Sequence, residues 1–350
     1  MSAKELPLPN HYSIRNAVWS YDAPINTLFG EANAFKKEHN ITPVSITDKK
    51  AHLLLIDAQK DFCFPEGALY VGGRTGRGAV EDSMRIAEFI YKNLGILTGI
   101  TATLDTHYPY QIFFPTFWLD ANGAHPNAHT TITFEDVISG KYRPNPALVD
   151  VLNISEEELK DHAVFYCKEL ARTGKYTLYL WPFHCLLGSN GHNIAGIIDE
   201  AIRFHSFVRS AQPNIVIKGT EPLTENYSVF SPEVKRTPRY SRIFHPNENL
   251  IQKLLAEDML IIAGEAASHC VKSSIDDLLD YINRKDKALA KKVYILIDCM
   301  SSVAVPDEKG GFIADFTDVA ETALKRYAAA GMNLVKSTDP IESFPNGGAK

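Results

Sequence analysis

Six short apolar runs, separated by longer amphipathic stretches, constrain the fold of this chain more than any other feature of its sequence. The runs are His52–Ile56, Ile96–Thr103, Asn214–Ile217, Met259–Ala263, Val293–Ile297 and Asn333–Val335. Short apolar runs of this kind are typical of strands that are buried on both faces, as in a parallel sheet. We therefore expect a buried, mostly parallel sheet of six strands.

The stretches between these runs carry apolar residues at helical spacing. Three such sets are Val80, Met84, Ala87, Tyr91 and Leu94; Val271, Ile275, Leu278 and Ile282; and Phe316, Val319, Ala323 and Tyr327. Alternating strands and helices with right-handed crossovers predict an α/β fold with a doubly wound sheet and helices on both faces. In such sheets ligands bind at the carboxyl ends of the strands.

Two segments do not follow the strand–helix repeat. Residues 1–49 precede the first strand and form an N-terminal extension, and residues 341–350 form a tail. Residues 108–180 form an insertion within the main domain, which spans residues 50–340. Ser155 and Glu158 have the spacing of a capping box and predict a helix start in the insertion. Long insertions in compact domains usually have a function, so we expect a lid or a subunit contact.

Composition excludes several classes of protein. The 36 Lys and Arg residues against 42 Asp and Glu give a net charge of 36 − 42 = −6, without a basic block, so no nucleic-acid partner is expected. No apolar run has the length that spans a membrane, and no membrane partner is expected. The five irregularly spaced cysteines do not resemble a disulfide framework and favour the cytoplasm. A homo-oligomer remains open.

Polar side chains follow four consecutive predicted strands at the point where each strand ends. Asp57 follows the first strand, Asp105 and His107 the second, Lys218 the third, and Cys270 the fourth. Because the carboxyl ends of parallel strands lie at one edge of a sheet, we expect these groups to meet.

Cys270 lies at the start of a predicted helix. Backbone N–H groups and the helix dipole stabilise a thiolate there, and Lys218 would lower the thiol pKa further. For an isolated cysteine, a buried apolar role is the more common one. The polar groups at the equivalent strand ends favour a nucleophile instead.

Asp105 and His107 are two residues apart, so their side chains leave a strand end on the same face. His184 is a third candidate ligand. One carboxylate and two imidazoles with open positions describe a catalytic metal site rather than a structural one. The alternative for each histidine is a hydrogen-bonded structural role.

Five motifs resemble those of one known family. DAQKDF, LDTH, WPFHC, IKG…NYSVF and GEAASHCV are similar, in this order, to the nicotinamidase branch of the isochorismatase-like cysteine hydrolases. The resemblance covers roughly residues 50–336 apart from the insertion, and implies the isochorismatase-like hydrolase fold. It also implies a catalytic triad of Asp57, Lys218 and Cys270.

The resemblance further implies a metal ion, a ring pocket and an oxyanion hole. Asp105, His107 and His184 would bind one divalent ion, with zinc preferred over iron or manganese. Phe62 and Trp181 would enclose a pyridine ring, beside Tyr227. The N–H groups of Ala266 and Cys270 would hold the oxyanion, with a cis peptide before Ala266.

Three functions remain open from the sequence. The first is nicotinamidase, which hydrolyses the small-molecule amide nicotinamide to nicotinate and ammonia through a thioester. The second is a related amidase for another carboxamide, because the insertion reshapes the pocket mouth. The third is a non-catalytic binding protein on the same fold, since fold does not fix function. The intact triad argues against the third.

Overall fold

A six-stranded sheet forms the centre of the molecule. The computed structural model describes residues 5–174, 176–238, 241–307 and 309–345. In spatial order the strands are β12 (Asn333–Val335), β9 (Val293–Leu296), β8 (Met259–Gly264), β1 (Ala51–Ile56), β2 (Leu97–Asp105) and β7 (Asn214–Lys218). Every neighbouring pair is parallel. The predicted α/β sheet is confirmed, and each of the six apolar runs forms a strand.

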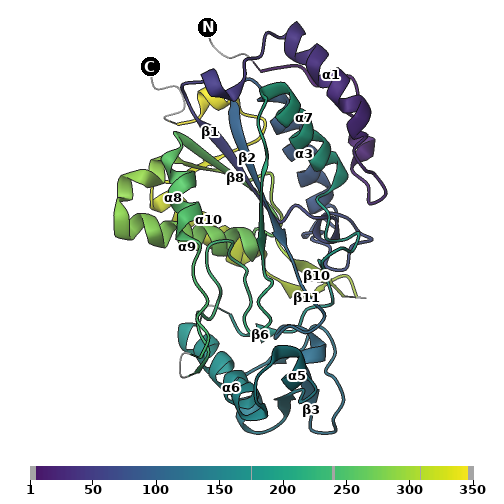
Figure 1. The fold of residues 1–350 in the computed structure, drawn as a ribbon, viewed down its shortest axis with the longest axis vertical. Helices are drawn as coiled ribbons and strands as arrows, with labels where there is room; N and C mark the ends of the chain where they lie inside the picture. Colours follow the sequence, from purple (N-terminus) through teal and green to yellow (C-terminus); the bar gives the residue numbers. More distant parts are fainter. Residues whose placement is uncertain (1–4, 175, 239–240, 308, 346–350) are drawn as a thin grey trace.

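Helices cover both faces of this sheet (Figure 1). One face carries α1 (Ile25–Glu38), α3 (Gly78–Lys92) and α7 (Gly196–Arg209), and the other carries α8 (Glu248–Ala256), α9 (Cys270–Lys285) and α10 (Thr317–Ala329). Leu53 and Leu55 of β1 belong to the first core, whereas Leu54 and Ile56 belong to the second. Burial on both faces explains the continuous apolar runs of the central strands β1 and β8, where each buried side chain contributes about 1.5–3 kcal/mol. The edge strand β7 differs, because Ile215 and Ile217 are exposed.

The helical patterns are borne out, with exceptions among the predicted core residues; Phe316, for example, precedes α10 as its N-cap. In α9 the four predicted core residues are all buried. Helix α3 ends at Lys92, so Leu94 lies beyond the helix, although it is still buried. Val319 of α10 is 41% exposed and is not a core residue. Helix α10 lies beside the edge strand β12, so a narrower stripe of the helix is covered.

The insertion between β2 and α7 forms the lower lobe in Figure 1. It contains two small antiparallel pairs, β3 (Trp118–Asp120) with β5 (Tyr142–Pro144) and β4 (Thr131–Ile132) with β6 (Leu178–Tyr179). Its helices are α4 (Phe134–Ile138), α5 (Leu148–Leu152) and α6 (Glu156–Thr173). The predicted capping box opens α6. The aromatic residues of the insertion share one core with α9, so the lobe packs onto the sheet domain.

The N-terminal extension contains a helix that the sequence pattern does not reveal. Leu28, Ala32 and Phe35 of α1 are buried, and α1 packs against α7. Three buried residues make only a narrow apolar stripe, so the sequence of α1 shows little helical periodicity. Its packing against α7 stabilises the helix instead.

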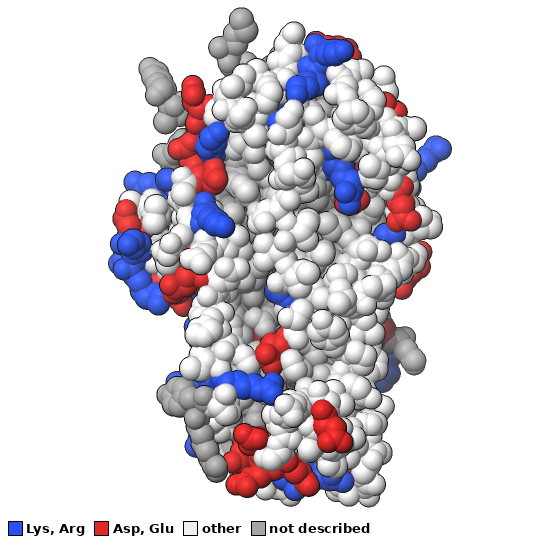
Figure 2. Space-filling view, viewed as in Figure 1, with Lys and Arg blue, Asp and Glu red and all other residues white. Residues whose placement is uncertain are grey.

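On the face seen in Figure 2, charged side chains of both signs lie mostly towards the two ends of the molecule. A band with few charges runs between them. Among the helices of the described residues, none combines the length and the apolar character that a membrane crossing needs.

Candidate active site

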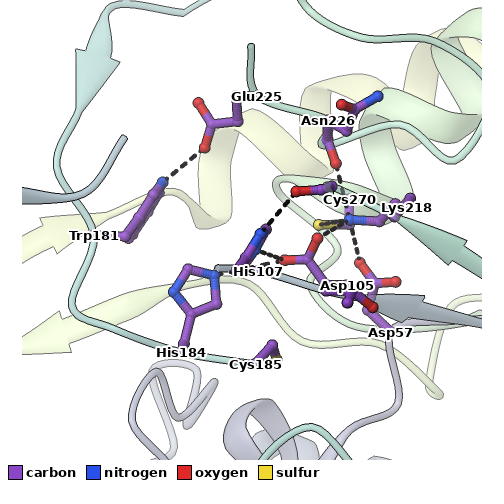
Figure 3. A network of polar contacts seen from close by, with 12 residues as sticks. Asp57, Asp105, His107, Trp181, His184, Cys185, Lys218, Glu225, Asn226 and Cys270 are labelled. Carbon is purple, nitrogen blue, oxygen red and sulfur yellow. Dashed lines mark hydrogen bonds and ion pairs between the residues drawn. The ribbon is translucent and has the colours of Figure 1, made fainter. Parts of the chain in front are cut away.

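Four strand ends bring the predicted polar residues together (Figure 3). Asp57 follows β1, Asp105 ends β2, Lys218 ends β7, and Cys270 begins α9 after β8. In chain order, the strands run outwards from β1 to β7 on one side and from β8 to β12 on the other. Such a reversal opens a crevice at the carboxyl ends of the strands, here between β1 and β8.

Lys218 connects the members of this cluster. Its Nζ lies 2.8 Å from Asp57 Oδ2 and 2.7 Å from Asp105 Oδ1. It also donates to the backbone oxygen of Asn226 at 2.9 Å and lies 3.7 Å from Cys270 Sγ. Burial lowers the pKa of this lysine, but the two carboxylates outweigh burial and hold the pKa well above its usual range. The ammonium group is therefore charged at neutral pH.

The thiol of Cys270 is not the thiolate that its helix position suggests. Burial raises the thiol pKa well above its ordinary value, and the neighbouring carboxylates add to this increase. Lys218 acts in the expected direction and lowers the pKa, but burial dominates. Burial also raises the pKa of Asp57, against the effect of Lys218. A neutral thiol beside a carboxylate of raised pKa requires proton transfer at the moment of attack.

Asp105, His107 and His184 form a buried group whose ligand atoms lie within 4.8 Å of one another. The Oδ2 atom of Asp105 is 2.8 Å from His107 Nε2 and 3.5 Å from His184 Nε2. The other ring nitrogens lie near backbone carbonyls, His107 Nδ1 at 3.2 Å from Gly219 and His184 Nδ1 at 2.8 Å from Pro182. If both Nδ1–H groups donate to those carbonyls, both Nε2 atoms are free to bind an ion beside Asp105, as around metal-ligating histidines.

Asp105 joins the metal-binding candidates to the catalytic candidates. One of its oxygens faces Lys218, and the other faces the two histidines. Burial raises the pKa of this carboxyl, but His107 and Lys218 outweigh it and hold the pKa well below its usual range. The group is therefore an anionic ligand at neutral pH, and one carboxylate with two imidazoles fits a divalent ion.

A small cavity of about 30 Å³ opens beside Cys270. Its walls include Phe62, Trp181 and Tyr227, the three residues proposed to contact a ring, together with Glu225 and His269. Trp181 is only 4% exposed, so it both packs in the core and lines the cavity.

The turn before Cys270 has the expected backbone geometry. The peptide between Glu265 and Ala266 is cis. Within the described part of the chain, neither the Ala266 nor the Cys270 N–H group donates to a backbone oxygen. Both donors remain available to a ligand at the mouth of the helix.

Two further residues of the DAQKDF motif position the site, although sequence reasoning assigned them no role. The side chain of Gln59 accepts from Asp105 N at 2.7 Å and donates to Asp105 O at 2.8 Å. Asp61 accepts from the backbone N–H of Cys185 at 2.6 Å, next to His184. Polar residues directly after a buried strand, in a motif already singled out, were the signal that could have identified them.

Comparison with known proteins supports the fold. No protein-family model and no curated protein matches the chain. The yeast nicotinamidase Pnc1p bound to the inhibitor nicotinaldehyde matches with a TM-score of 0.50 and 18% identity, over 82% of this chain and 99% of that one. The chain has the nicotinamidase fold.

Two further solved structures have lower TM-scores. An Acinetobacter baumanii nicotinamidase/pyrazinamidase matches with a TM-score of 0.48 and 18% identity, over 84% of this chain and 99% of that one. A Pyrococcus horikoshii pyrazinamidase in complex with zinc matches with a TM-score of 0.41 and 18% identity, over 83% of this chain and 99% of that one. The match to Pnc1p confirms the fold implied by the motifs, whereas activity has to be argued from the site.

Proposed function

We propose that this chain is a metal-containing cysteine amide hydrolase, with nicotinamide as its preferred substrate. The observation that carries the proposal is the joining of a buried Asp57–Lys218–Cys270 cluster to a cavity with aromatic walls. The cluster supplies a nucleophile, a proton acceptor and a fixed positive charge. The cavity lies beside the thiol and gives a bound substrate aromatic walls.

The raised thiol pKa assigns the first step to Asp57. Asp57 accepts the thiol proton as Cys270 Sγ attacks the amide carbon. Lys218 remains close to both groups and stabilises the developing thiolate. Negative charge moves to the carbonyl oxygen, where the N–H groups of Ala266 and Cys270 donate hydrogen bonds.

Collapse of the tetrahedral intermediate releases ammonia and leaves a thioester. Asp57 returns the proton to the departing nitrogen, so the C–N bond breaks without expulsion of an amide anion. Water then adds to the thioester, and Asp57 accepts a proton from it. The C–S bond breaks, and Asp57 returns the proton to the sulfur. The carboxylic acid product is released, and the thiol of Cys270 is regenerated.

Asp105, His107 and His184 would hold one divalent ion, with zinc preferred and iron or manganese as alternatives. When bound, the ion supplies a ligand position for a ring nitrogen and orders nearby water molecules. Asp105 would neutralise part of its charge while maintaining the contact with Lys218.

Nicotinamide suits these features because it combines a primary amide with a flat ring and a ring nitrogen. Phe62 and Trp181 line the cavity, and stacking between aromatic rings contributes about 0.5–1.5 kcal/mol beyond area burial. The ring would lie between these two side chains, with its amide towards Cys270 and its nitrogen towards the histidines.

A related amidase for another carboxamide is the second candidate. Tyr176 of the insertion packs against two residues of the cavity wall, with ring centroids 4.8 Å from Tyr227 and 5.9 Å from His269. The insertion therefore supports the wall from outside and can alter its shape. A non-catalytic binding protein on this fold is the third candidate.

Ammonia release from nicotinamide, benzamide and an aliphatic amide separates the three functions. We expect nicotinamide to give the highest kcat/KM and Cys270→Ala to lose at least about 1,000-fold in kcat. Cys167→Ala is the matched control, because Cys167 is also buried but lies in α6 of the insertion. A best rate with the aliphatic amide would indicate the second function, and normal activity of Cys270→Ala would refute the mechanism.

A further inference from the structure

The edge of the Trp181 ring is fixed by hydrogen bonds. Its Nε1 donates to Glu225 Oε1 at 3.0 Å and to the Tyr227 hydroxyl at 3.0 Å. Figure 3 shows the indole nitrogen directed at the Glu225 carboxyl group. Both acceptors belong to the loop after β7, the strand that also carries Lys218.

Glu225 is buried beside the cavity and is not used by the proposed mechanism. The residue is 7% exposed, and its carboxyl group interacts with Trp181 and Tyr227. Burial raises the pKa of this carboxyl to about 8, and the neighbouring Glu233 and Asp105 add to the increase. A carboxyl in this state still accepts the indole N–H bond, because protonation leaves acceptor capacity on its oxygens.

A buried indole N–H without an acceptor costs about 1–3 kcal/mol. The tryptophan ring therefore adopts the orientation in which its N–H reaches Glu225 and Tyr227. In that orientation the N–H already donates to protein acceptors, so a ligand in the cavity would contact the face of the Trp181 ring. Without Glu225, the Tyr227 hydroxyl is the one remaining acceptor of this pair, and it has lost its own hydrogen bond to Glu225, so the ring is held less firmly.

We propose that Glu225 is a specificity-determining positioning residue, which holds Trp181 so that its ring face forms one wall of the pocket. The inference deepens the proposed function, because it explains how a pocket of this chain would prefer flat aromatic amides to aliphatic ones. Glu225 itself touches no reacting atom. Its effect on turnover passes through the orientation of Trp181.

Kinetics of two Glu225 variants give the first test. Glu225→Leu should raise KM for nicotinamide more than it lowers kcat. It should reduce the preference for nicotinamide over an aliphatic amide by about 2- to 13-fold, the range that aromatic stacking supports. Glu225→Gln retains an acceptor oxygen and should therefore keep most of the preference for nicotinamide over the aliphatic amide. Glu221 lies in the same loop but does not line the cavity, so Glu221→Gln should leave the preference for nicotinamide unchanged.

The indole N–H resonances of ¹⁵N-tryptophan-labelled protein give a second test that needs no turnover. The Trp181 resonance, assigned with Trp181→Phe, should shift in Glu225→Leu and shift less in Glu225→Gln. Trp118 is the internal control, because its Nε1 donates to the backbone oxygen of Ile112 at 2.6 Å. Trp181→Phe also keeps a ring while removing the donor, so it should lower the aromatic preference even if Glu225→Leu does not fold.

The two tests separate this inference from the proposed function. If wild-type protein hydrolyses no nicotinamide, the proposed function fails, and the resonance shift still reports on the contact between Glu225 and Trp181. An unshifted Trp181 resonance in a folded Glu225→Leu protein would overturn the positioning role. An unchanged preference for the aromatic amide, in Glu225→Leu or in Trp181→Phe, would overturn the role in specificity.

Discussion

Replacing Lys218 with methionine should destabilise the protein by about 3–5 kcal/mol, in addition to stopping catalysis. The size of the loss follows from what the lysine leaves behind. Its Nζ lies within 2.8 Å of oxygens of both Asp57 and Asp105, whose side chains are at most 7% exposed. Two buried carboxylates would then face each other without the central positive charge, and little solvent reaches them.

Lys60→Met is the matched control. The Lys60 side chain is equally buried, at 1% exposure, and its Nζ lies 2.7 Å from Asp22. The Asp22 side chain, however, is 82% exposed, so water solvates it when the lysine is removed. The loss should stay near the 0–1 kcal/mol of a surface ion pair.

Urea denaturation of metal-free protein measures both losses. Lys218→Met should unfold at clearly lower urea concentration than Lys60→Met. The unfolding free energy of both variants should depend equally steeply on urea concentration, because both folded structures bury the same surface. Adding Asp57→Asn to Lys218→Met should restore part of the stability, because one uncompensated charge is removed. Equal stability of Lys218→Met and Lys60→Met would refute the argument from buried charge.

Three further outcomes are expected. His184→Ala should lose the bound divalent ion, measured by elemental analysis, while its circular dichroism stays unchanged; full metal content would refute the ligand set. Gly219→Ala should also lower metal content, because its φ is +85° and a Cβ would lie 2.8 Å from His107 Cε1; Gly310→Ala, with φ +82° and open space, controls for backbone strain alone. Glu225 has a folded-state pKa raised to about 8 from 4.5, so its contribution to stability is present below pH 4.5 and is lost as the pH rises through 8. Urea unfolding should therefore show wild-type stability falling by up to about 1.4 kcal/mol per pH unit relative to Glu225→Gln between these values; parallel pH profiles would refute a buried, protonated carboxyl.

The sequence determined the sheet and the set of residues at its edge. Each of the six runs forms a strand. Burial on both faces demands the uninterrupted apolar residues of the central strands β1 and β8. The edge strand β7 leaves Ile215 and Ile217 exposed, so full burial was wrong for that run. Once the strands are parallel, their carboxyl ends share one edge, so Asp57, Asp105, Lys218 and Cys270 could be placed together before any coordinates were known. The roles of these residues as triad and metal ligands came from motif resemblance, not from periodicity.

The tertiary structure decided the features that depend on contacts between distant segments. The pKa of Cys270 depends on how completely its surroundings exclude water, and the helix position alone suggested the opposite direction. The helix α1 and the exposure of Val319 follow from which neighbours cover them. The bond between Trp181 and Glu225 joins residues 44 positions apart in the chain. A sequence records which groups are present, whereas their free energies are set by burial and by partners that only folding brings within reach.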